Sequence, residues 1–169
     1  MKRRPSNPGT DRGQALVEFA LVAPMLVLLL LSIIEFGRAV YYVQMLDNAA
    51  REGARYAIVH GAASGCPSGP MPNGDPNACD PNGVYVEEAV KRYAIAIIDS
   101  NDAAFTVIRK WCPGNEPDCA ATAGLGNGDN GRGRQAYVEV DYTFSSLISA
   151  YVPIPTFTLS GRTTLVVNH

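Results

Sequence analysis

The sequence predicts an α+β fold, in which a long N-terminal transmembrane helix leads into a domain with one amphipathic helix on a three-stranded, or slightly larger, antiparallel sheet. Three observations support this fold class. The region from Phe19 to Ile34 contains no charged residue, an amphipathic helical pattern lies near residue 90, and three alternating patterns follow residue 104. Helices followed by strands are typical of α+β domains, in which helix covers one apolar face of the sheet.

The first helix is predicted over residues 14–60. Its apolar run extends back through Glu18 to Gln14, and about 20 such residues cross a hydrocarbon core of about 30 Å. No cluster of glycine or proline occurs between Gln14 and Gly61, so we expect a helix on the order of 70 Å long. Pro24 lies inside this helix and is expected to kink it or to remove one backbone hydrogen bond.

Charges differ on the two sides of the apolar run. Residues 1–13 carry four basic side chains and one acid, and such a basic flank stays in the cytoplasm. A secretory signal peptide has a similar start, but here no small-residue cleavage site follows the run, so we expect the helix to be retained. Residues 61–169 are then an extracytoplasmic globular domain. Their net charge of −4 does not indicate a nucleic-acid-binding surface, which would be basic.

Small residues recur every four positions beyond the apolar run, at Ala49, Gly53 and Ala57. Such a stripe lets another backbone approach the helix closely. The approaching backbone belongs either to a partner protein or to the chain's own globular domain. Under both interpretations the N-terminal helix is an interaction spine.

The globular domain begins with a loop rich in proline and glycine over residues 61–83 and continues with the amphipathic helix. The apolar positions of this helix are Val86, Ala89, Val90, Tyr93, Ala94, Ile97 and Ile98, opposite Glu87, Glu88, Lys91 and Arg92. Each strand pattern has apolar residues of one parity. These are Phe105, Val107 and Trp111, then Val138, Val140, Tyr142 and Phe144, and finally Leu159, Leu165 and Val167. Residues 145–155, too many for a tight hairpin, are expected to hold a helical turn.

Four cysteines, Cys66, Cys79, Cys112 and Cys119, lie in the domain predicted to be exported. An even number in an oxidising compartment favours two disulfides. Three connectivities are possible, and we expect the pairs closest in sequence, Cys66 with Cys79 and Cys112 with Cys119. A zinc site is the alternative, but neither spacing is as short as zinc-binding cysteine pairs require. We therefore assign no metal site to these residues.

Two segments rich in Asn, Asp and Gly, residues 73–83 and 126–134, contain oxygen atoms of the kind that Ca²⁺ prefers. Neither has the spacing of an EF-hand, and solvated turns use the same residues. His60 and His169 are the only histidines, and the sequence has no nucleophile elbow, P-loop or His-Glu-x-x-His motif. We therefore expect no cofactor and no enzymatic activity, since an anchored hydrolase would need a catalytic cluster.

Polar and small residues interrupt the first helix in a specific order. They are Gly13 after a basic residue, Glu18 before Phe19, Pro24, Glu35, Gly37, Arg38, and then the run Asn48-Ala49-Ala50-Arg51-Glu52-Gly53-Ala54-Arg55. This order resembles the TadE-like family, which are pseudopilins or minor pilins of the tight-adherence (Flp) pilus machinery of bacteria. The resemblance covers residues 12 to about 57, and it implies that the exported domain is pilin-like.

The resemblance also implies a processing site between Gly13 and Gln14. In type IV pilin-like precursors a prepilin-type aspartic peptidase of the membrane cuts after the glycine, so residues 1–13 would be a cleaved leader. Gln14 would then carry a new ammonium, which is costly to bury without a partner. Glu18 stands at the fifth mature position, where the glutamate of such proteins neutralises this terminus, and Phe19 and Pro24 belong to the same assembly segment. The alternative is that the Glu18 carboxylate only reaches the headgroups.

The function implied by the resemblance is that of a structural subunit or assembly factor of the pilus. The protein would be a single-pass protein of the cell membrane with its N-terminus in the cytoplasm. Its expected partners are the lipid bilayer, the prepilin-type peptidase, other pilins or pseudopilins and the pilus assembly platform proteins. The alternative is a permanently anchored extracytoplasmic binding module, an adhesin or sensor, which keeps its leader. Leader cleavage distinguishes the two.

Overall fold

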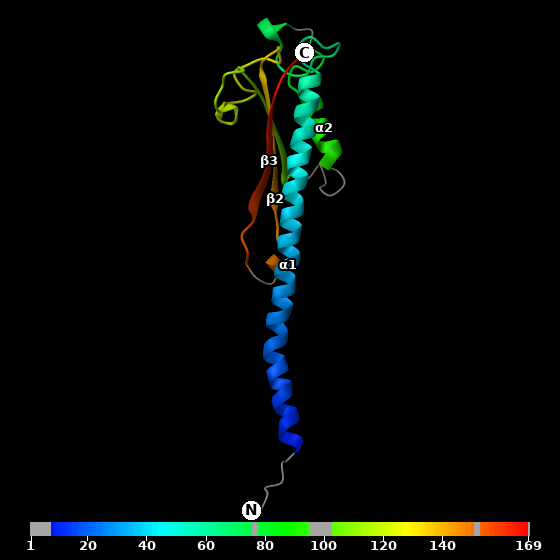
Figure 1. Ribbon diagram of the computed structural model, residues 1–169, viewed down its shortest axis with the longest axis vertical. Helices are drawn as coiled ribbons and strands as arrows, with labels where there is room; N and C mark the ends of the chain where they lie inside the picture. The colour runs from blue at the N-terminus through cyan, green and yellow to red at the C-terminus, as the bar shows by residue number, and fades with distance from the viewer. Residues whose placement is uncertain (1–7, 76–77, 95–102, 151–152, 169) are drawn as a thin grey trace, which may run out of the picture.

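The computed structural model describes residues 8–75, 78–94, 103–150 and 153–168 and has the predicted α+β architecture. Its main elements are α1 (Pro8–Val59), α2 (Val84–Ala94), β1 (Phe105–Cys112), β2 (Gln135–Phe144) and β3 (Phe157–Val166). Short 3₁₀ turns lie at Pro72–Gly74, Cys119–Ala121 and Leu147–Ala150, and the last of these is the helical turn expected between the second and third strands. The sheet and α2 lie along the C-terminal half of α1, whose N-terminal half projects beyond them (Figure 1).

Helix α1 begins before its predicted start, at Pro8, and ends at Val59, close to its predicted end. A proline is well tolerated in the first turn of a helix, because the N–H that it lacks would have no partner there. The helix also continues through Pro24, whose missing N–H leaves the carbonyl of Ala20 without its usual donor. Its most apolar window of 18 residues has a mean hydropathy of 2.6 and is not buried inside the protein. The helix is therefore long and apolar enough to span a membrane.

The three strands form an antiparallel sheet in the order β1-β2-β3. The register places Val107 opposite Val140, and Val140 in turn opposite Gly161. Because side chains alternate along a strand, this register brings the predicted apolar residues of all three strands to one face. Helices α1 and α2 cover that face, where α1 contacts β2, β3 and α2, and α2 also contacts β1.

The hydrophobic core lies between this face and the two helices. Its buried residues are Leu46, Ala49, Ala50, Ala54 and Ala57 from α1, Val86, Val90 and Ala94 from α2, and Phe105, Trp111, Ala136, Val138, Val140 and Val167 from the sheet and the residue after it. A smaller cluster of Cys112, Cys119 and Tyr137 is buried on the opposite face. Burial and the neighbouring Glu139 carboxylate raise the pKa of Tyr137 above its usual range.

The position of Tyr93 differs from the prediction. Val86, Val90 and Ala94 of α2 are buried as predicted, but Tyr93 is 49% exposed. The buried stripe of α2 repeats every four residues and is therefore narrow, so that Tyr93, one position before Ala94, is turned about 100° away from it. The predicted Ile97 and Ile98 lie outside the described residues.

Candidate functional site

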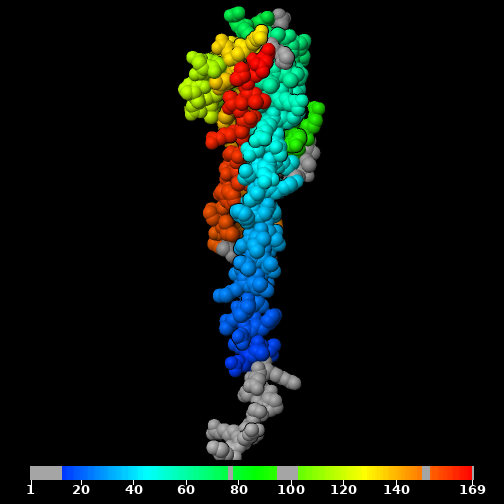
Figure 2. Space-filling model, in the orientation of Figure 1, coloured from blue at the N-terminus to red at the C-terminus, as the bar shows by residue number. Residues whose placement is uncertain are grey.

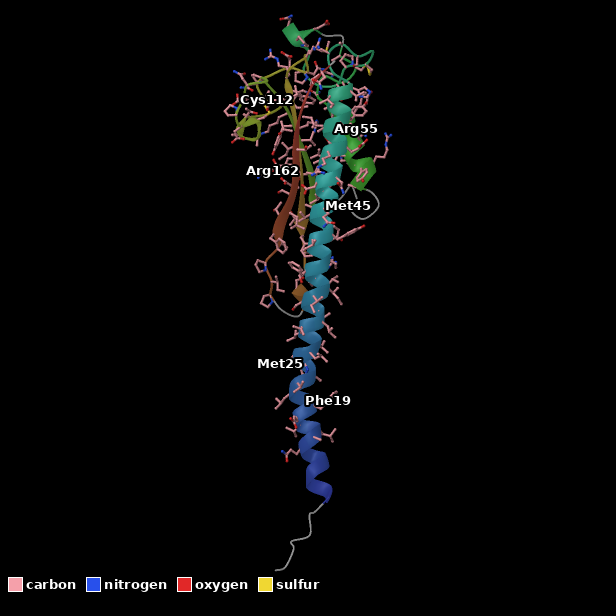
Figure 3. The ribbon with its side chains drawn as sticks, in the orientation of Figure 1. Phe19, Met25, Met45, Arg55, Cys112 and Arg162 are labelled. Atoms are coloured by element: carbon pink, nitrogen blue, oxygen red, sulfur yellow. A yellow bond between two sulfur atoms is a disulfide. The ribbon has the colours of Figure 1, made fainter. Side chains whose placement is uncertain are left out.

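The N-terminal half of α1 is an apolar surface that the described part of the chain leaves uncovered. Its exposed residues are Leu16, Val17, Phe19, Leu21, Val22, Met25, Leu26, Val27, Leu28, Leu29, Leu30, Leu31, Ile33, Ile34 and Phe36. Figure 2 shows this half standing clear of the rest of the molecule, and in Figure 3 Phe19 and Met25 lie on it, far from Cys112. A helix that is apolar on all sides requires lipid or other helices around it.

The carboxylate of Glu18 lies within this apolar surface. Its side chain is exposed, and none of the ion pairs formed by the described residues includes it. Glu18 lines an open hollow together with Gly13, Gln14 and two apolar neighbours. Because it follows Gln14 by four residues, the two lie on one face, about 6 Å apart along the helix axis. A positive charge at the backbone nitrogen of Gln14 would thus lie one helical turn from the carboxylate of Glu18 in the same chain.

The bond between Gly13 and Gln14, the predicted processing site, lies inside α1 near its beginning. Both residues are exposed, and a Cβ added at Gly13 would meet no atom within 4 Å. The fold of the described residues therefore does not explain why a glycine is present there.

The predicted small-residue stripe packs on the chain's own domain. Ala49, Gly53 and Ala57 are all buried. A Cβ at Gly53 would collide with Cγ2 of Val90 and would lie 3.3 Å from Cγ1 of Val138. The stripe therefore holds α1 between α2 and β2 within one molecule.

Glu35 links α1 to the segment that connects β2 and β3. One of its carboxylate oxygens accepts a hydrogen bond from the backbone N–H of Leu147 at 2.6 Å, and the other forms an ion pair with Arg38 at 3.0 Å. The guanidinium of Arg38 also lies over the ring of Phe144, 5.1 Å from its centre. These contacts hold the connection between β2 and β3 against α1.

The contact from Glu35 to Leu147 was not predicted, because no local pattern links residues that are 112 positions apart. The ion pair between Glu35 and Arg38 follows from their spacing of three residues on a helix. The one available signal was composition, since residues 142–161 contain no charged side chain.

The four cysteines form disulfides at the end of the domain farthest from the N-terminus. Cys66 pairs with Cys79 and Cys112 pairs with Cys119, with Cα atoms 5.2 and 5.8 Å apart. The first bond closes the loop between α1 and α2, and the second closes the loop after β1. This is the connectivity expected from sequence proximity.

The acids of the two Asn/Asp/Gly-rich segments have structural contacts. Asp80 accepts hydrogen bonds from the backbone N–H groups of Val84 and Tyr85 at the start of α2, and from the hydroxyl of Ser68. Asp129 accepts from the N–H of Gly131 and pairs with Arg134 at 3.3 Å. Within the described ranges no group of three or more His, Cys, Asp or Glu residues is placed to hold a metal ion. These oxygens therefore stabilise loops.

A hollow of about 430 Å³ between α1 and α2 was also not predicted. Its lining residues are Glu52 and Tyr56 from α1 and Tyr85, Glu88, Ala89, Arg92 and Tyr93 from α2. Tyr56 stacks on His60 with ring centres 3.9 Å apart, and burial, followed by the charge of Asp80, raises the pKa of Tyr56. The tyrosines come from two helices, so only the tertiary structure brings them together.

Comparison with known families identifies one segment of the chain. The family model described as TadE-like protein matches residues 13–55. No curated protein and no solved structure matches the chain. The matched segment begins at Gly13 and includes Glu18, the uncovered apolar surface, Glu35 and most of the buried stripe. It confirms the resemblance over this part of α1 and ends before α2 and the sheet.

Proposed function

We propose that this protein is a membrane-anchored pseudopilin or minor pilin, a structural subunit or assembly factor of a tight-adherence pilus. The TadE-like match over residues 13–55 supports a connection with this pilus system at the level of the family. One structural observation carries the finer assignment. The carboxylate of Glu18, one helical turn beyond Gln14, lies in an apolar surface that no other described part of the chain covers.

The proposed mechanism begins with the cleavage of residues 1–13 by a prepilin-type aspartic peptidase. Cleavage creates an ammonium at Gln14, which remains solvated while the helix end is at the cytoplasmic face of the membrane. When subunits associate, their apolar helix surfaces exclude water, and a buried ammonium must then find a carboxylate. Glu18 of the same or a neighbouring subunit supplies it. The charge pair thereby makes incorporation depend on processing.

The C-terminal half of α1 has a different role in this proposal. Its small residues are buried against α2 and β2, so the domain moves as one body with the helix. The N-terminal half then contacts the bilayer, other pilins and the assembly platform, while the disulfide-bonded domain is displayed outside the cell. The proposal gives the protein a structural function without catalysis or a cofactor.

The test is coexpression of the full chain with a prepilin-type peptidase. The wild-type chain is expected to lose residues 1–13 and to begin with Gln-Ala-Leu-Val-Glu, as read by terminal sequencing. Gly13→Leu is expected to block cleavage, because a side chain there obstructs the peptidase subsite. Gly37→Leu is the matched control, since Gly37 lies in the same helix with open space around it, and this variant should be cleaved normally. Cleavage of Gly13→Leu at the wild-type rate would refute this assignment.

The alternative, a permanently anchored binding module, has one supporting observation. The hollow lined by Tyr56, Tyr85 and Tyr93 is large enough for a small ligand or a peptide side chain. An adhesin or sensor of this kind needs its helix only as an anchor and can keep residues 1–13. An intact Met1 terminus on protein from cells that assemble the pilus would favour this function over the pilin.

A further inference from the structure

The connection between β2 and β3 forms the end of the sheet nearest the N-terminal half of α1. Glu35 holds it there through the backbone N–H of Leu147. A hollow of about 280 Å³ lies between the two elements, lined by Ser32, Glu35, Phe36 and Ala39 of α1 and by Phe144, Ser146, Ile148, Ile154 and Phe157. In Figure 1 the turn at Leu147–Ala150 lies beside α1, where the helix emerges from the domain. We call this end of the sheet, described over residues 144–150 and 153–157, the sheet tip.

The sheet tip exposes apolar side chains and no charged ones. Leu147 is 66% exposed, Phe157 46% and Ile154 36%. No charged residue occurs between Asp141 and Arg162, in contrast to the net negative charge of the whole domain. The exposed surface of the tip is continuous with that of α1, where Phe36 is 73% exposed. Contiguous apolar surface of this kind marks an interaction site in a folded protein.

The length of the apolar run of α1 determines the level at which the sheet tip would lie relative to the bilayer. A span of about 20 residues crosses a hydrocarbon core of about 30 Å, so a span that starts at Gln14 ends near Ile34. Glu35 is the next residue, and the tip is bound to it. Leu147 and Phe157 therefore lie at the boundary between headgroups and acyl chains. Apolar surfaces of interfacial elements insert about 5–10 Å at this boundary.

The two charges at this depth are compensated. Glu35 pairs with Arg38, and its side chain is only 13% exposed. The guanidinium of Arg38 lies over the rings of Phe144 and Tyr42. A tyrosine close to the interface is also typical of membrane proteins, which concentrate Tyr and Trp at this level. The arrangement thus suits an environment less polar than water.

From these observations we propose that the sheet tip contacts the outer leaflet of the bilayer that holds α1. The occupant of its exposed apolar surface is lipid, at the level of the headgroups and upper acyl chains. The domain is then held at two points, by α1 within the membrane and by Leu147, Ile154 and Phe157 on its surface. A subunit leaving the bilayer must release both contacts. The proposal rests on α1 lying in a membrane with the domain on its outer side, and it does not depend on pilus assembly.

The test uses tryptophan fluorescence in vesicles of phosphatidylethanolamine and phosphatidylglycerol whose acyl chains carry bromine, a short-range quencher of indole. The full chain has one tryptophan, Trp111, which is buried at the other end of the sheet and serves as an internal reference. Phe157→Trp and Val166→Trp are a matched pair, because both positions are on β3 and 46% exposed. Leu147→Trp is a second tip variant that keeps the backbone N–H bound by Glu35. Phe19→Trp is the reference within the span.

Bromine is expected to remove most of the added emission at positions 147 and 157, as at position 19, and to leave position 166 and Trp111 unchanged. The proposal would be overturned if bromine quenched the emission at position 19 but left the emission at positions 147 and 157 unchanged, as at position 166. Absence of quenching at all positions, including position 19, would also overturn it, because it would show that α1 does not lie in the bilayer. If the emission at 147 changes only when chains are crowded, without bromine quenching, the occupant is a second copy and the proposal is also wrong.

Discussion

Glu35 and Glu18 are two acids of one helix with opposite environments. Glu35 uses both carboxylate oxygens within its own molecule, for Arg38 and for the N–H of Leu147. Glu18 is exposed and belongs to none of the ion pairs among the described residues. At the scale of single residues, Glu35 therefore stabilises the fold, whereas Glu18 is available to a partner. Different experiments should separate these roles.

Replacement of Glu35 should loosen the sheet tip. In Glu35→Ala the N–H of Leu147 loses the carboxylate that accepts its hydrogen bond, and Arg38 loses its ion-pair partner. We expect faster hydrogen exchange at the amide of Leu147, measured on the full chain in detergent. Glu35→Gln keeps a carbonyl acceptor, so its Leu147 amide should exchange at a rate between those of wild type and Glu35→Ala. Exchange in Glu35→Ala equal to wild type would show that the contact does not hold the tip.

Replacement of Glu18 should affect assembly and not processing. Glu18→Ala leaves Gly13 and the basic flank intact, so cleavage is expected to be normal. The buried ammonium at Gln14 would lose its partner, at a cost of about 3–5 kcal/mol, or two to three decades in subunit docking at about 1.4 kcal/mol each. Crosslinking and pilus counts at equal protein level measure this loss.

The controls for this experiment follow from the structure. Glu18→Asp keeps the charge on a shorter side chain and should assemble to an intermediate extent. Gln44→Ala changes an exposed polar residue of the same helix and should assemble like wild type, whereas Glu35→Ala is unsuitable because it disturbs the tip. Normal assembly of Glu18→Ala would mean that the carboxylate only reaches the headgroups.

Among the elements of the fold, two glycines set the distances between α1 and its neighbours, β3 and α2. A Cβ at Gly161 of β3 would collide with the backbone of Leu46 and Asp47, and one at Gly53 of α1 with the side chain of Val90. Val90 is fully buried, and its β-branched side chain has few alternative rotamers. Neither neighbour can move aside easily. The close approach of α1 to β3 thus depends on Gly161, and its close approach to α2 depends on Gly53.

A methyl group at Gly53 should therefore destabilise the domain. Overpacking in a core typically costs about 1–3 kcal/mol, and the better helix propensity of alanine returns at most about 1 kcal/mol. We expect Gly53→Ala to lower the unfolding midpoint of the detergent-solubilised chain. Gly37→Ala makes the same change in the same helix where a Cβ meets nothing, so its midpoint should stay equal or rise. Equal midpoints for Gly53→Ala and wild type would contradict the packing described.

The elements that could be predicted from the sequence are those with a strong local period. The alternation of Val138, Val140 and Phe144 predicted the buried face of β2, because a strand turns successive side chains to opposite faces. The position of Tyr93 could not be predicted, since the width of the buried stripe on α2 depends on what packs against it. The early start of α1 at Pro8 was missed because the polar composition of the leader gives no helical period.

The candidate site was also predictable only in part, because only its local features can be identified from the sequence. Gly13, Glu18 and Pro24 were identified by their order along one helix, which is a local property. Sequence could not decide whether the stripe around Gly53 faces a partner or the domain, because both require small residues. The contact between Glu35 and Leu147 depends on the fold of the whole chain. The absence of charge over residues 142–161 does not identify the residue of α1 that binds this segment, so the contact itself could not be predicted.

At the scale of the whole molecule, an uncovered apolar helix is joined to a domain closed by two disulfides (Figure 3). The domain's core is a single sheet face under two helices, and its loops are long. Each disulfide is expected to contribute about 2–4 kcal/mol, mainly by restricting the unfolded chain. The domain should therefore depend on an oxidising compartment for its stability.

Peptide mapping without reductant tests this expectation. It should recover Cys66 joined to Cys79 and Cys112 joined to Cys119, and reduction should lower the unfolding temperature of the full chain. Cys112→Ala with Cys119→Ala should remove one bond and leave the other intact. Four free thiols, or zinc bound in stoichiometric amount, would show that the cysteines have another role.

In the proposed mechanism, processing creates the terminus that assembly requires. The most direct measurement is mass spectrometry of the N-terminal peptide of this protein, purified from the membranes and sheared pili of cells that assemble the pilus. We predict a terminus at Gln14, with the Gly13→Leu chain found only in the membrane and beginning at Met1. A wild-type chain that keeps Met1 in these cells would show that assembly does not require processing.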